Sequence, residues 1–119
     1  MTTDQICELC RTFPHAIEEL KWDNDLVFTI GGKMFAVVGL AEEEFAGVAF
    51  KCDDGDFERL AEVKGIVPAP YLARAKWVQV QEEEALPAGE LTAQLRKSYE
   101  IVKSKLPKSR QAELTGSMA

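Results

Sequence analysis

Cysteine and histidine side chains are the residues of this chain best suited to thiol or metal chemistry. Cys7 and Cys10 form a Cys-X-X-Cys pair, while Cys52 and the single histidine, His15, stand apart from it. A redox pair is expected where a strand meets the N-terminus of a helix, because that position lowers the thiol pKa. Here both cysteines lie in the apolar stripe of an expected helix, so the sequence favours buried free thiols.

A zinc site drawn from these four side chains is an alternative, because tetrahedral zinc accepts cysteine and histidine ligands. It lacks a second close pair of ligands, so no metal or cofactor is predicted. His15 has no partnered nucleophile and is interpreted as a solvent-facing turn residue. The glutamate runs at residues 42–44 and 82–84 could attract a hard cation, but such runs are more typical of solvated turns. No catalytic residue is predicted, and the protein is expected not to be an enzyme.

Basic side chains are concentrated in the second half of the chain. The net charge of the 119 residues is −6, which argues against a dedicated nucleic-acid binder. Residues 61–119 nevertheless hold nine bases and seven acids, whereas residues 1–60 hold five bases and 13 acids. Because salt screens charges over about 10 Å, local charge decides where an anion is attracted.

The elements that must hold these side chains follow from hydrophobic periodicity. Helical spacing predicts a first helix that ends at Pro14, and alternating patterns then predict four strands between residues 18 and 52. Gly31-Gly32 is the turn of one hairpin. Residues 53–65 predict a second helix, residues 76–80 a last strand, and residues 87–107 a final helix. The order α-β-β-β-β-α-β-α predicts an α+β fold, an antiparallel meander packed by helices.

The length predicts a single domain over residues 1–119, with residues 107–119 as a flexible tail. No apolar run reaches the roughly 20 residues of a membrane span, and the N-terminus lacks the pattern of a secretion signal. We therefore expect a cytoplasmic monomer that does not contact a membrane.

The segment at residues 67–80, VPAPYLARAKWVQV, is the leading candidate for a binding surface. If the valines of its strand face the core, Trp77 lies on the polar side of the sheet. An exposed tryptophan beside Lys76, with Arg74 and Tyr71 close in sequence, suits stacking on a base and contact with a phosphate. The alternative is that helices cover both aromatic residues.

Further candidate bases lie in the hairpin and in the last helix. Lys33 follows the Gly31-Gly32 turn and is expected at the tip of a hairpin, or else is an ordinary solvated lysine. The last helix and its continuation carry six bases, namely Arg96, Lys97, Lys103, Lys105, Lys108 and Arg110. They could neutralise phosphates, or they could simply offset the dipole at the C-terminus of the helix.

Five short motifs occur in a fixed order along the chain: GGKMFA, FKC, PAPYL, KWV and SY, at residues 31–36, 50–52, 68–72, 76–78 and 98–99. In these motifs and their spacing the chain resembles the MmcQ/YjbR family, small bacterial proteins with a CyaY-like fold. The resemblance departs at His15 and Asp23, where the family often has glycine. It implies a double-wing arrangement of β-hairpins and a DNA-binding function.

The residues and the resemblance together predict binding of DNA or another anionic partner. The expected binding residues are Lys33, Tyr71, Arg74, Lys76, Trp77, Arg96, Lys97 and Lys103. The rival hypothesis is a protein-interaction or small-ligand module that uses Trp77 and Tyr71 as an apolar anchor. Steep loss of affinity with salt would favour the first hypothesis, and affinity that barely depends on salt would favour the second.

Overall fold

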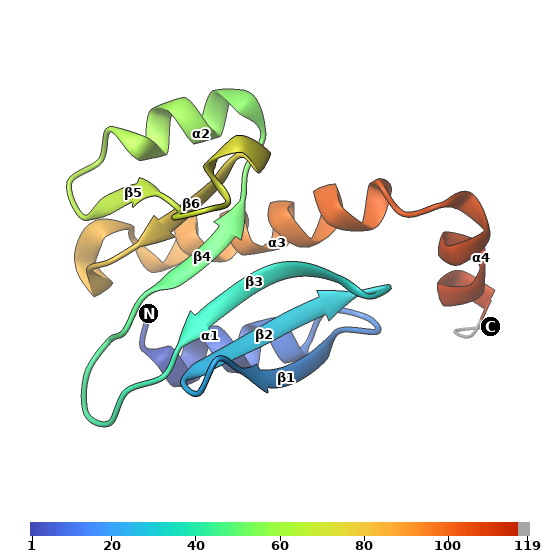
Figure 1. Ribbon diagram of the computed structural model, residues 1–119, viewed down its shortest axis with the longest axis horizontal. Coiled ribbons are helices and arrows are strands. Elements are labelled where there is room, and N and C mark those ends of the chain that lie inside the picture. Colours follow the sequence, from blue (N-terminus) through green and yellow to red (C-terminus); the bar gives the residue numbers. More distant parts are fainter. Residues whose placement is uncertain (117–119) are drawn as a thin grey trace.

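A computed structural model of the chain describes residues 1–116 and places its six strands in one antiparallel sheet (Figure 1). The strands are β1 (Ile17–Lys21), β2 (Asp25–Ile30), β3 (Lys33–Gly39), β4 (Val48–Lys51), β5 (Ile66–Pro68) and β6 (Trp77–Val80). The α-helices are α1 (Thr3–Arg11), α2 (Asp54–Ala61), α3 (Ala88–Ser104) and α4 (Lys108–Gly116). Single turns of 3-10 helix lie at η1 (Ala73–Ala75) and η2 (Glu83–Ala85). The strand order is β1-β2-β3-β4-β6-β5, so the predicted α+β class is confirmed.

Helices α1 and α3 lie behind the sheet and bury its main core, as Figure 1 shows. Helix α1 begins with a capping box between Thr2 and Gln5, which satisfies two backbone N–H groups at its start. Its apolar stripe, which includes Ile6 and Cys10, packs with Phe28 and Leu95 in this core. The sheet is therefore positioned by a long helix, α3, whose C-terminal end reaches the β2–β3 hairpin.

An irregularity in β3 links this helix to two strands. The register between β2 and β3 shifts at Phe28/Thr29, so Phe35 has no direct partner on β2, and both Phe35 and Ala36 are fully buried. The carbonyl oxygen of Phe35 accepts a 2.6 Å hydrogen bond from the buried hydroxyl of Ser98. The same hydroxyl accepts a 2.9 Å bond from the backbone N–H of Lys51. One serine on α3 thus fixes β3 and the end of β4 together.

Most elements agree with the prediction, and the differences concern short or terminal segments. Strand β5 was not predicted, because three residues before a proline-rich corner carry no alternating pattern. The proline-rich corner also contains one turn of 3-10 helix, at Ala73–Ala75. Residues 108–116 form helix α4 where a flexible tail was predicted, and residues 117–119 of that tail lie outside the described residues.

None of the helices within residues 1–116 combines the length and the apolar content that crossing a bilayer demands.

Gly39 permits the close approach of the β3–β4 loop, and this gives a stability prediction. A Cβ atom at Gly39 would collide with the carbonyl group of Ala46, while the Gly39 N–H donates to Gly47 at 2.9 Å. Because both neighbours are backbone, Gly39→Ala is expected to lower the free energy of unfolding by about 1–3 kcal/mol in urea denaturation. Gly89→Ala is the control, because a Cβ atom there meets nothing within 4 Å. It should raise stability by about 0.5 kcal/mol, and equal effects of the two variants would contradict the argument.

Candidate anion-binding site

Three lysines from separate elements gather at one end of the sheet. Lys33 begins β3, Lys51 ends β4, and Lys105 directly follows α3. They line a single hollow of about 270 Å³, whose other lining residues are Met34, Trp77 and Val102. We call this site the lysine hollow. Its floor is apolar and its ionisable groups are all amines.

The fold explains why these residues meet. In an antiparallel sheet the start of β3, the end of β4 and the start of β6 lie at the same end, and Lys51 is the cross-strand partner of Trp77. Gly31 lets the hairpin tip approach the end of α3, because a Cβ atom there would lie 2.6 Å from a methyl carbon of Leu106. Ser98 holds the backbone of Lys51 from the other side. The hollow is therefore fixed by three strands and one helix.

The three lysines of the hollow lack an ion-pair partner among the described residues. Burial lowers the pKa of the Lys51 amine, and the neighbouring charge of Lys105 lowers it further, while Cys52 and Asp54 act weakly in the opposite direction. The Lys51 amine donates a hydrogen bond to the carbonyl oxygen of Ala75. An anion entering the hollow would relieve the repulsion between Lys51 and Lys105.

Trp77 does not have the role predicted for an exposed aromatic. Its neighbour Val78 faces the core, as expected, but Trp77 itself is only 4% exposed. Its cross-strand partner is Lys51, whose amine donates to the carbonyl of Ala75, two residues before the tryptophan. The prediction that Trp77 is exposed is therefore wrong, and the residue instead lines the hollow.

The corner between β5 and β6 carries three of the predicted binding residues, Tyr71, Arg74 and Lys76. Tyr71 is fully exposed, and Arg74 is exposed on η1, whose carbonyl at Ala75 accepts the bond from Lys51. Lys76 is turned toward α2, with its amine 5.1 Å from the centre of the Phe57 ring. Tyr71 and Arg74 thus remain available to a partner, whereas the Lys76 amine has an aromatic neighbour within the protein.

Of the bases predicted on the last helix and its continuation, Lys105 lines the hollow, whereas Arg96, Lys97 and Lys103 do not. Lys97 donates to Asp53 at 3.2 Å and to Asp56 at 2.6 Å, so its charge is already compensated and it ties α3 to α2. Arg96 lies 5.7 Å from the centre of the Phe13 ring, and Lys103 lies 5.8 Å from that of Tyr99. These two bases, seven residues apart on α3, therefore lie over buried aromatic rings and do not line the hollow.

The ion pair between Lys97 and Asp56 predicts an acid-dependent loss of stability. Hydrogen bonding from Lys97, with further bonds from Gln94 and Arg59, holds the pKa of Asp56 below its ordinary value of 3.8. Because the folded pKa is depressed, this stabilisation is present above pH 3.8 and is lost as the pH falls through the lower folded pKa. Asp56→Asn is expected to lower stability by about 1 kcal/mol at neutral pH.

Urea denaturation at pH 7 and near pH 3 measures this effect. The difference in stability between wild type and Asp56→Asn should shrink at the lower pH. Glu113→Gln is the control, because Glu113 pairs only with Arg110 on the exposed helix α4. A difference for Asp56→Asn that is equal at both pH values would exclude the stated origin.

The thiols and the histidine are placed as the sequence favoured. Cys7, Cys10 and Cys52 are buried and free, and burial raises the pKa of both Cys10 and Cys52 to about 12. His15 is exposed in the turn after α1, with a φ of 62°. Among the residues that the structure describes, no group of three or more histidine, cysteine or acidic side chains is arranged to hold a metal ion.

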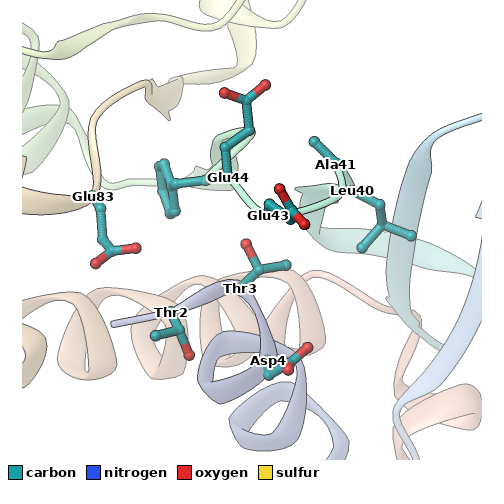
Figure 2. A pocket seen from close by; sticks show the side chains of 9 residues that line it. Thr2, Thr3, Asp4, Leu40, Ala41, Glu43, Glu44 and Glu83 are labelled. Carbon is teal, nitrogen blue, oxygen red and sulfur yellow. The ribbon is translucent and has the colours of Figure 1, made fainter.

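The two glutamate runs meet at the other end of the sheet. Side chains from both runs and from α1 line a hollow of about 330 Å³, and its acidic members are Asp4, Glu43, Glu44 and Glu83. Figure 2 shows that their carboxylates point in different directions rather than toward one centre. The sequence did not predict this meeting, which depends on the pairing of β4 with β6. The sheet therefore has an acidic end and a basic end.

Comparisons with known proteins agree on the family and the fold. The family model YjbR matches residues 11–101. The crystal structure of the Deinococcus radiodurans protein DR2400, with a domain labelled DUF419, superposes with a TM-score of 0.84 at 29% identity. That match covers 96% of this chain and 88% of the other. A Pseudomonas syringae protein superposes with a TM-score of 0.69 at 17% identity, covering 86% and 99%, which supports the fold alone. A search of curated proteins found no match.

Proposed function

The chain belongs to the YjbR family, and from this premise we propose that it binds the phosphate backbone of DNA without catalysing a reaction. The observation that carries the proposal is the lysine hollow, where Lys33, Lys51 and Lys105 surround one volume and form no ion pair within residues 1–116. Protein amines that lack a carboxylate partner bind phosphate oxygens and release counterions from the nucleic acid.

The distribution of charge supports a fixed orientation on the DNA. The net charge of −6 opposes binding by the molecule as a whole. The acidic residues of the far hollow lie beyond the opposite ends of β4 and β6, so DNA repels that end and attracts the other. Exposed Arg74 and Tyr71 extend the basic end through the β5–β6 corner and add a cation and a surface for stacking.

The proposal of a binding protein rather than an enzyme rests on the state of the reactive side chains. The buried thiols have raised pKa values, which keeps them protonated and poorly nucleophilic. His15 is exposed in the turn that follows α1 and is not among the residues that line the lysine hollow. The described residues therefore offer an anion site without an assembled nucleophile and base.

Fluorescence anisotropy of a labelled DNA duplex tests the proposal. If the three lysines each neutralise one phosphate, log affinity should fall against log salt with a slope of about −2.7, or about 40-fold between 0.05 and 0.2 M salt. Absence of binding at low salt, by protein whose fold is verified by circular dichroism, would refute the proposal. Binding with a slope near zero would instead favour the rival protein-interaction module.

A further inference from the structure

We infer that the lysine hollow is a site for a terminal phosphate monoester whose organic group carries a ring. This inference rests on the proposed function and narrows its ligand: a nucleoside 5′-monophosphate or the 5′-phosphorylated end of a DNA strand supplies the required group. Both share one chemistry, a phosphate attached through a single ester oxygen, and the experiment below separates them.

The convergence of charge favours a monoester over the diesters inside a strand. A phosphate monoester carries about −1.5 to −2 charges at neutral pH on three terminal oxygens. An internal diester carries one negative charge, and successive phosphates of a duplex are spread along its surface. Three amines around about 270 Å³ therefore match one concentrated dianion better than a row of separate monoanions.

The donors of the hollow can reach such a dianion from several sides. Lys51 uses one of the three N–H donors of its amine on the carbonyl of Ala75, which leaves two for a ligand. Lys33 and Lys105 are exposed and come from the hairpin and from the end of α3. Because Lys51 is held at its backbone by Ser98, it is the fixed member of the three. The two exposed lysines then close on the bound phosphate.

The floor of the hollow explains the preference for a ring-bearing ester over free phosphate. Met34 is partly exposed and supplies most of the apolar side-chain surface that a ligand can cover, because Trp77 and Val102 line the hollow with only 4% and 6% exposure. Inorganic phosphate gains nothing from apolar surface, whereas each Å² of apolar area that a ligand covers contributes about 25 cal/mol. A flat base or sugar next to the phosphate would cover this floor, so the ester should bind more tightly than the ion.

Isothermal titration with four probes tests the ligand class. The probes are deoxyadenosine 5′-monophosphate, its 3′,5′-cyclic diester, deoxyadenosine and inorganic phosphate. The monophosphate is expected to bind at least about tenfold more tightly than each of the others. Lys51→Gln should weaken that binding about tenfold or more, while Lys64→Gln, an exposed lysine after α2, should leave it unchanged. The exposed pair Lys33→Gln/Lys105→Gln tests the site again if Lys51→Gln does not fold.

A second arm compares hairpin duplexes with a 5′-phosphate and a 5′-hydroxyl end. Tighter binding of the phosphorylated hairpin, with competition by the monophosphate, supports the inference with a DNA end as the source. Binding of the monophosphate alone supports the inference and refutes the proposed function. Equal binding of both hairpins, with no competition from about 10 mM monophosphate, overturns the inference and leaves the proposed function standing. If nothing binds, both fail.

Discussion

Replacing Lys33, Lys51 and Lys105 together with glutamine is expected to remove most of the affinity for duplex DNA at low salt. Each lysine that neutralises a phosphate contributes about 0.9 to the slope of log affinity against log salt, so the triple variant should lose about 2.7 from that slope. Lys51→Gln alone should lose about 0.9. Anisotropy titrations at four or more salt concentrations measure both the slope and the affinity.

Lysines at the other end of the sheet provide the matched control. Lys21 ends β1, where it lies 3.8 Å from Glu19, and Lys64 is exposed beyond the end of α2. The variant Lys21→Gln/Lys64→Gln changes the net charge as much as Lys33→Gln/Lys105→Gln does. If total charge governed binding, the two pairs would weaken it equally. If the lysine hollow binds DNA, only Lys33→Gln/Lys105→Gln should reduce the slope of log affinity against log salt, by about 1.8.

Hydrophobic periodicity was sufficient to predict most elements of the fold. The change from helical spacing to alternation after Pro14 locates the start of the sheet, and Gly31-Gly32 marks the hairpin that presents Lys33. These are local signals, because the hydrophobic period of each element and the residues of each turn can be read from a short stretch of sequence. Strand β5 was not predicted because its pairing with β6 depends on the tertiary fold and not on the pattern of its three residues.

The site was less predictable because the meeting of side chains that are far apart in the sequence depends on the tertiary fold. Lys51 and Lys105 are 54 positions apart and meet only through the position of α3 behind β4. Lys97 was predicted to be a binding base because nothing in the sequence indicates its ion pairs with Asp53 and Asp56. The burial of Trp77 likewise depends on tertiary packing and not on the local sequence. Alternation gave the correct face for Trp77 but could not predict what covers it.

The family motifs gain a physical meaning from this arrangement. GGKMFA supplies Lys33 and Met34, FKC supplies Lys51, and KWV supplies Trp77, all of which line the lysine hollow. The SY motif supplies Ser98, which holds Lys51. Motifs that are separate in the chain therefore build one end of the molecule. The hydroxyl of Ser98 carries the second large expected effect.

Ser98→Ala is expected to lower the free energy of unfolding by about 2–4 kcal/mol. The substitution leaves two backbone groups, the Phe35 carbonyl and the Lys51 N–H, without this hydrogen-bond partner. The hydroxyl is fully buried, donates to the carbonyl of Phe35 and accepts from the N–H of Lys51. Phe35 lies at the irregularity of β3, so its carbonyl depends on this helix side chain for a partner. Thermal and urea denaturation measure the loss.

Ser104→Ala controls for the chemistry of the change on the same helix. The Ser104 hydroxyl is exposed and donates only to the carbonyl of Ile101 at 2.8 Å, so its removal should alter stability by less than about 0.5 kcal/mol. If Ser98→Ala lowered the free energy of unfolding no more than Ser104→Ala does, water would have to replace the hydroxyl as hydrogen-bond partner of Phe35 and Lys51. The proposed link between α3, β3 and β4 would then be wrong.

Binding data on the same variant separate a loss of stability from a loss of site geometry. At a temperature where Ser98→Ala stays folded, the variant should bind duplex DNA more weakly than wild type does, because the backbone of Lys51 has lost its hydrogen bond to Ser98. Because Ser98 acts on the site through Lys51, Ser98→Ala should weaken binding less in a Lys51→Gln background than in wild type. The effect of Lys64→Gln should simply add to that of Ser98→Ala, since Lys64 touches neither group. Full additivity of Ser98→Ala with Lys51→Gln would mean that Ser98 supports the fold without positioning the amine.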